Sequence, residues 1–206
     1  MTIQVTTPAL HGEGRTADGG EIATYRSSSG AQAESAISGD RLKLDLSGKI
    51  EVGESGVPEV VGVLRATLAA NGREVRTGRE AQNRDDDARL SIDGHDVPIQ
   101  VVTVPSEPSL WAELARGSAT TDVPIALAAT WVRDAITAKA RQYPDDLRKD
   151  LILAIDARFV PVLPSAAVVA SYLSQFPDPT VASGFAAVWL VGPRESRCTQ
   201  LGNGKW

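Results

Sequence analysis

The chain contains very little cysteine and histidine, and this scarcity excludes two kinds of protein. Cys198 is the single cysteine among 206 residues, so no intramolecular disulfide can form. The two histidines, His11 and His95, lie far apart in the sequence and do not show the ligand spacing of a zinc site. We therefore expect neither a disulfide scaffold nor a zinc module, and a lone thiol fits a reducing, cytoplasmic environment.

The sequence also lacks a long apolar run and an excess of positive charge. No stretch approaches the ~20 consecutive apolar residues of a membrane-spanning helix, and the first residues, MTIQVTTPALHGEG, do not resemble a secretory signal. Lys and Arg number 21 against 26 Asp and Glu, which gives a net charge of -5. Because proteins that bind nucleic acid usually carry a basic surface, this balance argues against a general polyanion binder. No membrane association is expected.

Apolar residues are numerous enough for one sizeable domain. They make up 42% of the 206 residues, which is sufficient to bury a substantial core. Residues 1–40 are rich in Gly, Ser, Thr and Ala, and we expect them to form a loosely ordered polar extension. From Arg41 the pattern tightens, and residues 41–206 are expected to form a single domain.

Helix and strand patterns alternate along this domain. Apolar runs over residues 150–159 and 184–193 are typical of strands covered on both faces. Helical periodicity or capping predicts helices over residues 57–70, 120–143 and 165–176. The alternation predicts an α/β fold with a three-layer α-β-α core and a mixed sheet.

Residues 85–102 carry polar side chains where packing does not require them. The Asp-Gly pair at 93–94 is a strong hairpin signal, so paired strands are expected on either side of it. Asp87 stands at the start of the first strand, and Gln100 interrupts the apolar run of the second. Neighbouring strands lie ~4.8 Å apart, so both side chains would meet at one edge of the sheet. Mg²⁺ accepts a carboxylate, an amide oxygen and a backbone carbonyl as ligands.

A plainer interpretation is that residues 85–87 form a solvated acidic turn and that Gln100 is a satisfied amide at a sheet edge. Lys139 bears on the choice, because it falls near the middle of the apolar stripe of the helix predicted over 120–143. An unpaired ammonium is costly to bury, so Lys139 is expected to have a partner. Alternatively, its side chain extends along the stripe to reach water.

This combination resembles the PD-(D/E)xK nuclease superfamily, whose fold is called restriction-endonuclease-like. The resemblance covers about residues 57–191, with the core order α-β-β-β-α-β. On this resemblance Asp87 occupies the position of the first metal-binding acid and Gln100 that of the second. Val102 stands where the family's lysine is expected. Lys139 is placed like the lysine of members in which it has migrated to the following helix.

The resemblance implies a Mg²⁺-dependent nuclease, or one that uses Mn²⁺, that cleaves phosphodiester bonds in DNA. Asp87, Gln100 and the carbonyl of Val101 would hold the cation. Lys139 would orient the attacking water or stabilise charge on the phosphate. Glu59 matches a carboxylate found in the first helix of family members and would support a metal-bound water. Since Gln100 replaces an acid, weaker metal binding is expected.

The sequence leaves two other classes of function open. One is a catalytically inactive member of the same fold that serves as a binding or scaffold module, and the other is a structural or regulatory α/β protein. The acidic balance and Val102 favour these classes, whereas Lys139 favours the enzyme. DNA is the expected partner of the enzyme, and a protein partner or homodimer is also compatible. Basic residues available for a phosphate path are Arg73, Arg76, Arg79, Arg84, Arg89, Lys139, Arg141, Arg148 and Lys149.

Overall fold

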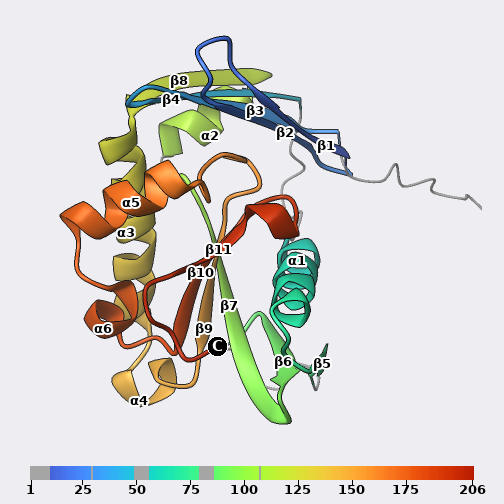
Figure 1. Ribbon diagram of the computed structural model, residues 1–206, viewed down its shortest axis with the longest axis vertical. Coiled ribbons are helices and arrows are strands. Elements are labelled where there is room, and N and C mark those ends of the chain that lie inside the picture. The colour runs from blue at the N-terminus through green and yellow to red at the C-terminus, as the bar shows by residue number, and fades with distance from the viewer. Residues whose placement is uncertain (1–9, 29, 49–55, 79–85, 107) are drawn as a thin grey trace, which may run out of the picture.

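Two β-sheets and six helices make up the part of the chain that the structure, a computed structural model, describes (Figure 1). The described residues are 10–28, 30–48, 56–78, 86–106 and 108–206. The smaller sheet lies across one end of the larger one, and side chains from both belong to one buried core (Figure 1). The chain is a mixed α/β protein, as the alternation of helix and strand patterns predicted.

The smaller sheet has five strands, all antiparallel to their neighbours. In order across the sheet they are β1 (Leu10–Arg15), β2 (Glu21–Arg26), β3 (Gln32–Ser38), β4 (Arg41–Ser47) and β8 (Ser118–Pro124). Leu42, Leu44 and Leu46 of β4 are buried, while the residues between them reach the surface or are only half-buried. An antiparallel sheet with one solvated face shows this alternation.

Residues 10–38 are not the loosely ordered extension expected from their composition, because they form β1, β2 and β3. Ala23, Tyr25, Ala33 and Ile37 are buried at alternating positions on the inner face. A strand with one solvated face needs an apolar residue only at every second position, and backbone pairing with β4 completes the sheet. The small apolar residues of this segment are therefore sufficient for a strand, although their low total hydrophobicity suggested otherwise.

Strand β8 comes from the middle of the chain and completes the smaller sheet. It pairs with β4 from Arg41 opposite Pro124 to Ser47 opposite Ser118. The long helix that follows begins at Ile125, so the predicted start at residue 120 was wrong. Residues 120–123 read Thr-Thr-Asp-Val, and their β-branched side chains favour a strand where a partner strand is available.

The larger sheet is mixed and has six strands. Across the sheet they are β11 (Cys198–Leu201), β10 (Ala187–Val191), β9 (Ile152–Asp156), β7 (His95–Thr103), β6 (Ala88–Ile92) and β5 (Val75–Thr77). The central strands β10, β9 and β7 run parallel, and the outer strands pair antiparallel. All residues of β9 and β10 are buried, as expected for strands covered on both faces.

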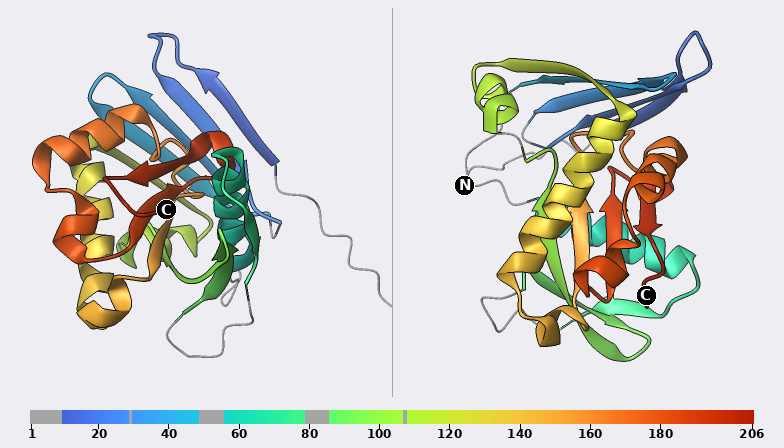
Figure 2. Two further views of the ribbon diagram at one scale, coloured as in Figure 1. Left: turned by 60° about the horizontal axis from the view of Figure 1, so that its bottom comes forward. Right: turned by 90° about the vertical axis from the view of Figure 1, so that its left-hand side faces the viewer.

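Helices cover both faces of the larger sheet. On one face lies α1 (Val57–Ala70), which packs in one buried cluster with Val97, Ile99 and Val101 of β7. The other face carries α3 (Ile125–Gln142), α5 (Ala166–Gln175) and α6 (Pro179–Ser183), and Figure 2 shows α3 running along the sheet. Shorter helices are α2 (Pro108–Leu114) and α4 (Asp145–Arg148). Within the described ranges, no helix has the length and apolar character needed to cross a membrane.

The carboxyl ends of β7, β9 and β10 point toward the smaller sheet (Figure 1). Open α/β sheets commonly bind ligands at this edge. Here, however, residues 156–165 are all buried, and the backbone N–H of Val162 donates to Oγ of Ser35 in β3 at 3.0 Å. The edge is therefore filled by the chain's own residues.

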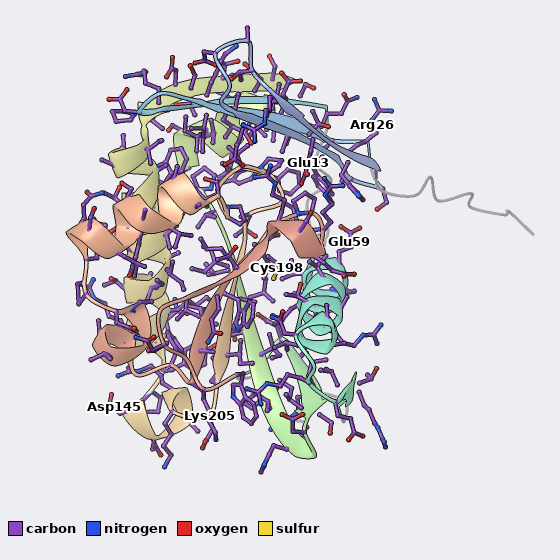
Figure 3. All side chains as sticks on the ribbon, in the orientation of Figure 1. Glu13, Arg26, Glu59, Asp145, Cys198 and Lys205 are labelled. Carbon is purple, nitrogen blue, oxygen red and sulfur yellow. The ribbon has the colours of Figure 1, made fainter. Side chains whose placement is uncertain are left out.

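The single thiol reports on the packing of α1 against the sheet. Cys198 lies at the start of β11 on the side of α1 (Figure 3), and burial raises the pKa of its thiol to about 11. The folded chain should therefore react with iodoacetamide at pH 8 about 100-fold more slowly than the urea-unfolded chain, since each pKa unit lowers the thiolate fraction tenfold. Equal rates in the two states would show that the thiol is not protected by this packing.

Candidate functional site

The hairpin of β6 and β7 sets the positions of the two polar residues singled out in the sequence. Its turn has positive φ at both central residues, 50° at Asp93 and 81° at Gly94, as a tight two-residue hairpin turn requires. The register places Ala88 opposite Ile99, so Asp87 stands opposite Gln100. Even-numbered residues of β7 face α3, and the two side chains share that face.

Asp87 and Gln100 are in direct contact. The Gln100 amide nitrogen donates to Oδ2 of Asp87, and the same oxygen accepts the backbone N–H of Val101 at 2.8 Å. On the other side of the amide, the Tyr143 hydroxyl donates to Oε1 of Gln100 at 2.5 Å. Gln100 is only 5% exposed, whereas Asp87 lies at the surface. The three side chains form a connected polar group at the solvent edge of the sheet, which we call the Asp87 cluster.

Lys139 lies on α3, one helical turn before Tyr143, so the two residues share a helix face. The side chain is half-buried. No hydrogen bond or ion pair joins Lys139 to another residue in the described part of the chain. The expected partner is therefore not seen there, and the arrangement agrees with the alternative in which the side chain extends from the apolar stripe to water.

Glu59 does not lie with the Asp87 cluster. It belongs to α1, which covers the face of the sheet opposite to the one that carries Asp87 and Gln100. Figure 3 shows Glu59 at the end of α1 nearest the smaller sheet. The expectation that Glu59 supports the metal site is corrected accordingly, because its carboxylate is bound by Tyr25 and Arg158 instead.

Glu59 instead joins a buried ionic cluster at the junction of the two sheets. Arg158, which is 4% exposed, donates from Nε and Nη2 to the two oxygens of Asp156, each at 2.9 Å. Its Nη1 donates to Glu59 Oε2 and to the Tyr25 hydroxyl, and the hydroxyl donates to Glu59 at 2.7 Å. Gly56 leaves room for the guanidinium, since a Cβ there would overlap with Nη2. Strands β2 and β9 and helix α1 thus meet on one arginine.

The surroundings of Arg158 keep its guanidinium charged. Burial is the largest influence on the pKa of Arg158 and lowers it, but hydrogen bonding and charge from Asp156, with further charge from Glu59, raise it above its ordinary value. Burial also raises the pKa of Tyr25, so this phenol stays protonated and available as a donor. Every guanidinium nitrogen of Arg158 donates to an oxygen. We therefore assign the cluster a structural role in holding the sheets together.

The basic residues proposed as a phosphate path are largely neutralised where the structure describes them. Four of these basic residues form ion pairs: Arg73 with Asp93, Arg76 with Glu74, Arg89 with both Asp86 and Asp96, and Arg148 with Asp145. In the described residues, Lys139, Arg141 and Lys149 make no such contact. Asp85, Arg79 and Arg84 lie outside the described residues. The free positive charge therefore gathers on α3 and after α4, on the same side of the sheet as Asp87.

A divalent cation fits this cluster only after one rearrangement. As placed, the Gln100 amide turns its nitrogen, not its oxygen, toward Asp87. A half-turn of the amide would exchange the two, because the Tyr143 hydroxyl can accept a hydrogen bond as well as donate one. Asp87, Gln100 and the carbonyl of Val101 would then offer three oxygens and leave room for waters, which suits Mg²⁺. Among the described residues, no group of three or more His, Cys, Asp or Glu side chains is arranged to hold a metal.

Comparison with known proteins assigns no family to the chain: no family model, curated protein or solved structure matches it.

Three residues were not recognised in the sequence as members of polar groups. The spacing of Tyr143 puts it on the apolar face of the helix predicted over 120–143, but spacing gives no sign that its hydroxyl reaches Gln100. Asp156 and Arg158 stand at the end of the apolar run over residues 150–159. Two opposite charges, two residues apart at the end of a fully buried strand, are a usable signal for a buried ion pair, because neither charge is tolerated there alone.

Replacement of Arg158 tests the ionic cluster. Arg158→Ala should lower the free energy of unfolding by about 3–5 kcal/mol, because it leaves the Asp156 carboxylate buried without its partner. Urea denaturation measures the change. Arg76→Ala removes an exposed ion pair with Glu74 and should change stability by less than about 1 kcal/mol. Similar losses in both variants would contradict the role assigned to Arg158.

The Tyr143 hydroxyl is tested by its removal. Tyr143→Phe should destabilise the fold by about 0.5–1.5 kcal/mol, because the buried Gln100 oxygen loses its donor. Tyr172→Phe is a matched control, because the Tyr172 hydroxyl has no hydrogen bond to any described residue. Thermal unfolding of the two variants should differ, and equal stability would mean that the Tyr143 hydrogen bond contributes nothing.

Proposed function

We propose that the chain has a restriction-endonuclease-like fold and acts as a Mg²⁺-dependent nuclease on DNA, with Mn²⁺ as an alternative cation. The single observation that supports this most is the direct contact of Asp87 and Gln100 on one face of the hairpin. The order of the elements of the larger sheet also supports it: α1, β5, β6, β7, α3 and β9 follow the α-β-β-β-α-β pattern once the inserted α2, β8 and α4 are set aside.

In this proposal, the chain's own residues bind and position the phosphodiester. Asp87 is anchored by the backbone N–H of Val101 and by Gln100, which fixes the direction of its carboxylate. Lys139 is free to pair with a phosphate oxygen, because no described residue neutralises it. A bound Mg²⁺ would supply a Lewis acid at Asp87, Gln100 and Val101. With one carboxylate in the set, cation affinity is low.

One observation favours a second candidate, a catalytically inactive module of the same fold that binds a partner. Gln100 already has a hydrogen bond at both ends of its amide, to Asp87 and to Tyr143. A satisfied amide of this kind stabilises the hairpin without a cation. Val102 also lies where the family carries its lysine.

Cleavage assays separate the two candidates. With plasmid and single-stranded DNA in Mg²⁺ or Mn²⁺, wild type should cleave, and Asp87→Ala and Lys139→Ala should each lose about 100-fold or more in rate, as when one charge-stabilising group is removed. Lys43→Ala, which changes an exposed lysine on β4 of the smaller sheet, should retain the wild-type rate.

A gain of charge gives the matching positive test. Gln100→Glu should lower the Mg²⁺ concentration needed for half-maximal cleavage, because a second carboxylate joins the cation site. DNA binding without cleavage under any cation would favour the inactive module. If the chain neither binds nor cleaves DNA, both candidates are contradicted.

A further inference from the structure

A second concave site lies on the helical side of the molecule. It is a pocket of about 630 Å³ between α3, α4, α5 and α6, a size usual for small-molecule sites. These helices lie together on one side in Figure 1, and Figure 3 places Asp145 of α4 at the end of the molecule far from the smaller sheet. The pocket is separate from the buried junction of the sheets.

The lining combines an apolar body with positive charge. Ile136, Ala140, Phe176 and two prolines form much of the wall, and no Asp or Glu lines it. The same helices also carry large exposed apolar side chains: Leu147 on α4, Leu173 on α5 and Val181 on α6. Such a surface favours a ligand with an aromatic or aliphatic body.

Three arginines line the pocket, and their partners differ. Arg133 lies over the ring of Phe176, with 5.1 Å from its guanidinium carbon to the ring centre, and pairs with Asp134. Arg148 donates to the carbonyl of Tyr143 at 2.6 Å and to Asp145. Arg141 is exposed and has no ion pair with any described residue. Arg141 therefore gives the lining its uncompensated positive charge.

Tyr172 supplies a buried donor without an acceptor. It is 3% exposed, it lines the pocket, and its hydroxyl makes no hydrogen bond to a described residue. Burial raises the pKa of Tyr172 to about 12, so the hydroxyl keeps its proton at neutral pH. The nearby carboxylate of Asp178 is occupied by the N–H groups of Thr180 and Asn203, at 2.9 and 2.8 Å. The hydroxyl is therefore available to an acceptor that enters the pocket.

We propose that this pocket binds a small organic anion, an aromatic or aliphatic body that carries one acidic group. The body lies against Phe176 and Ile136, while the acidic group accepts from the Tyr172 hydroxyl and faces Arg141. This site is distinct from the proposed nuclease centre. The two share one side chain, since Tyr143 lines the pocket and its hydroxyl donates to Gln100.

Fluorescence titration with two dyes tests the proposal on the full chain. The probe is 8-anilinonaphthalene-1-sulfonate, and its neutral counterpart is N-phenyl-1-naphthylamine, which lacks the sulfonate. The anionic dye should saturate at one molecule per chain, and the neutral dye should bind about fivefold more weakly, as expected for loss of one exposed ion pair. A near-ultraviolet circular dichroism spectrum confirms that the chain is folded.

Variants assign the binding to this pocket. Ala182→Trp fills it and should abolish saturable binding, whereas Ala70→Trp on α1 should not. Arg141→Gln should weaken the anionic dye about fivefold and leave the neutral dye unchanged, with Arg116→Gln as the arginine control outside the pocket. Tyr172→Phe should weaken the anionic dye by about two- to tenfold, the range for one hydrogen bond.

Three results would overturn the proposal. They are the absence of saturable binding by the folded wild type, wild-type affinity in a folded Ala182→Trp chain, and equal affinity for the two dyes. If Ala182→Trp does not fold, the anionic dye is compared in Arg141→Gln and Arg116→Gln. Equal affinity of the two variants for this dye would then overturn the proposal. A dimer that covers the pocket would appear as a concentration-dependent change in mass without dye binding, and it would likewise contradict the assignment.

Discussion

The bidentate pairing of Arg158 with Asp156 is the constraint on which the arrangement of the two sheets depends. Both residues are buried, and the same guanidinium reaches Glu59 on α1 and Tyr25 on β2. A buried arginine is tolerable only when each of its donors has an acceptor, so Arg158 and its three partners must be assembled together. The junction that this cluster forms occupies the edge where an α/β sheet would otherwise open to a ligand, and polar chemistry is left to the hairpin and to the helical side.

The parts of the fold that follow from local pattern could be predicted from the sequence. The Asp-Gly turn, the helix over residues 57–70 and the buried strands at 152–156 and 187–191 all have short-range signals. Strands β1–β3 of the smaller sheet were missed because they carry few large apolar side chains. Their stability depends on pairing with β4 and on a core supplied by distant residues, which no local window contains.

The candidate site was predictable to the extent that it depends on strand register. A tight turn at 93–94 fixes which residues stand opposite each other, so the proximity of Asp87 and Gln100 could be inferred. The contribution of Tyr143 could not, because it depends on where α3 crosses the sheet. Glu59 was misplaced for a related reason: periodicity assigns a residue to a helix but not to a face of the sheet.

The late position of β8 has a consequence for the chain as it leaves the ribosome. Until residues 118–124 emerge, β4 is an edge strand with unpaired backbone groups, and at roughly 5–20 residues per second this lasts for several seconds. Open edges invite pairing with other chains. Lys43 and Asp45 project from the outer side of β4, and charges there discourage such contacts. The nascent chain therefore carries its own protection against misassembly during the interval in which its smaller sheet is incomplete.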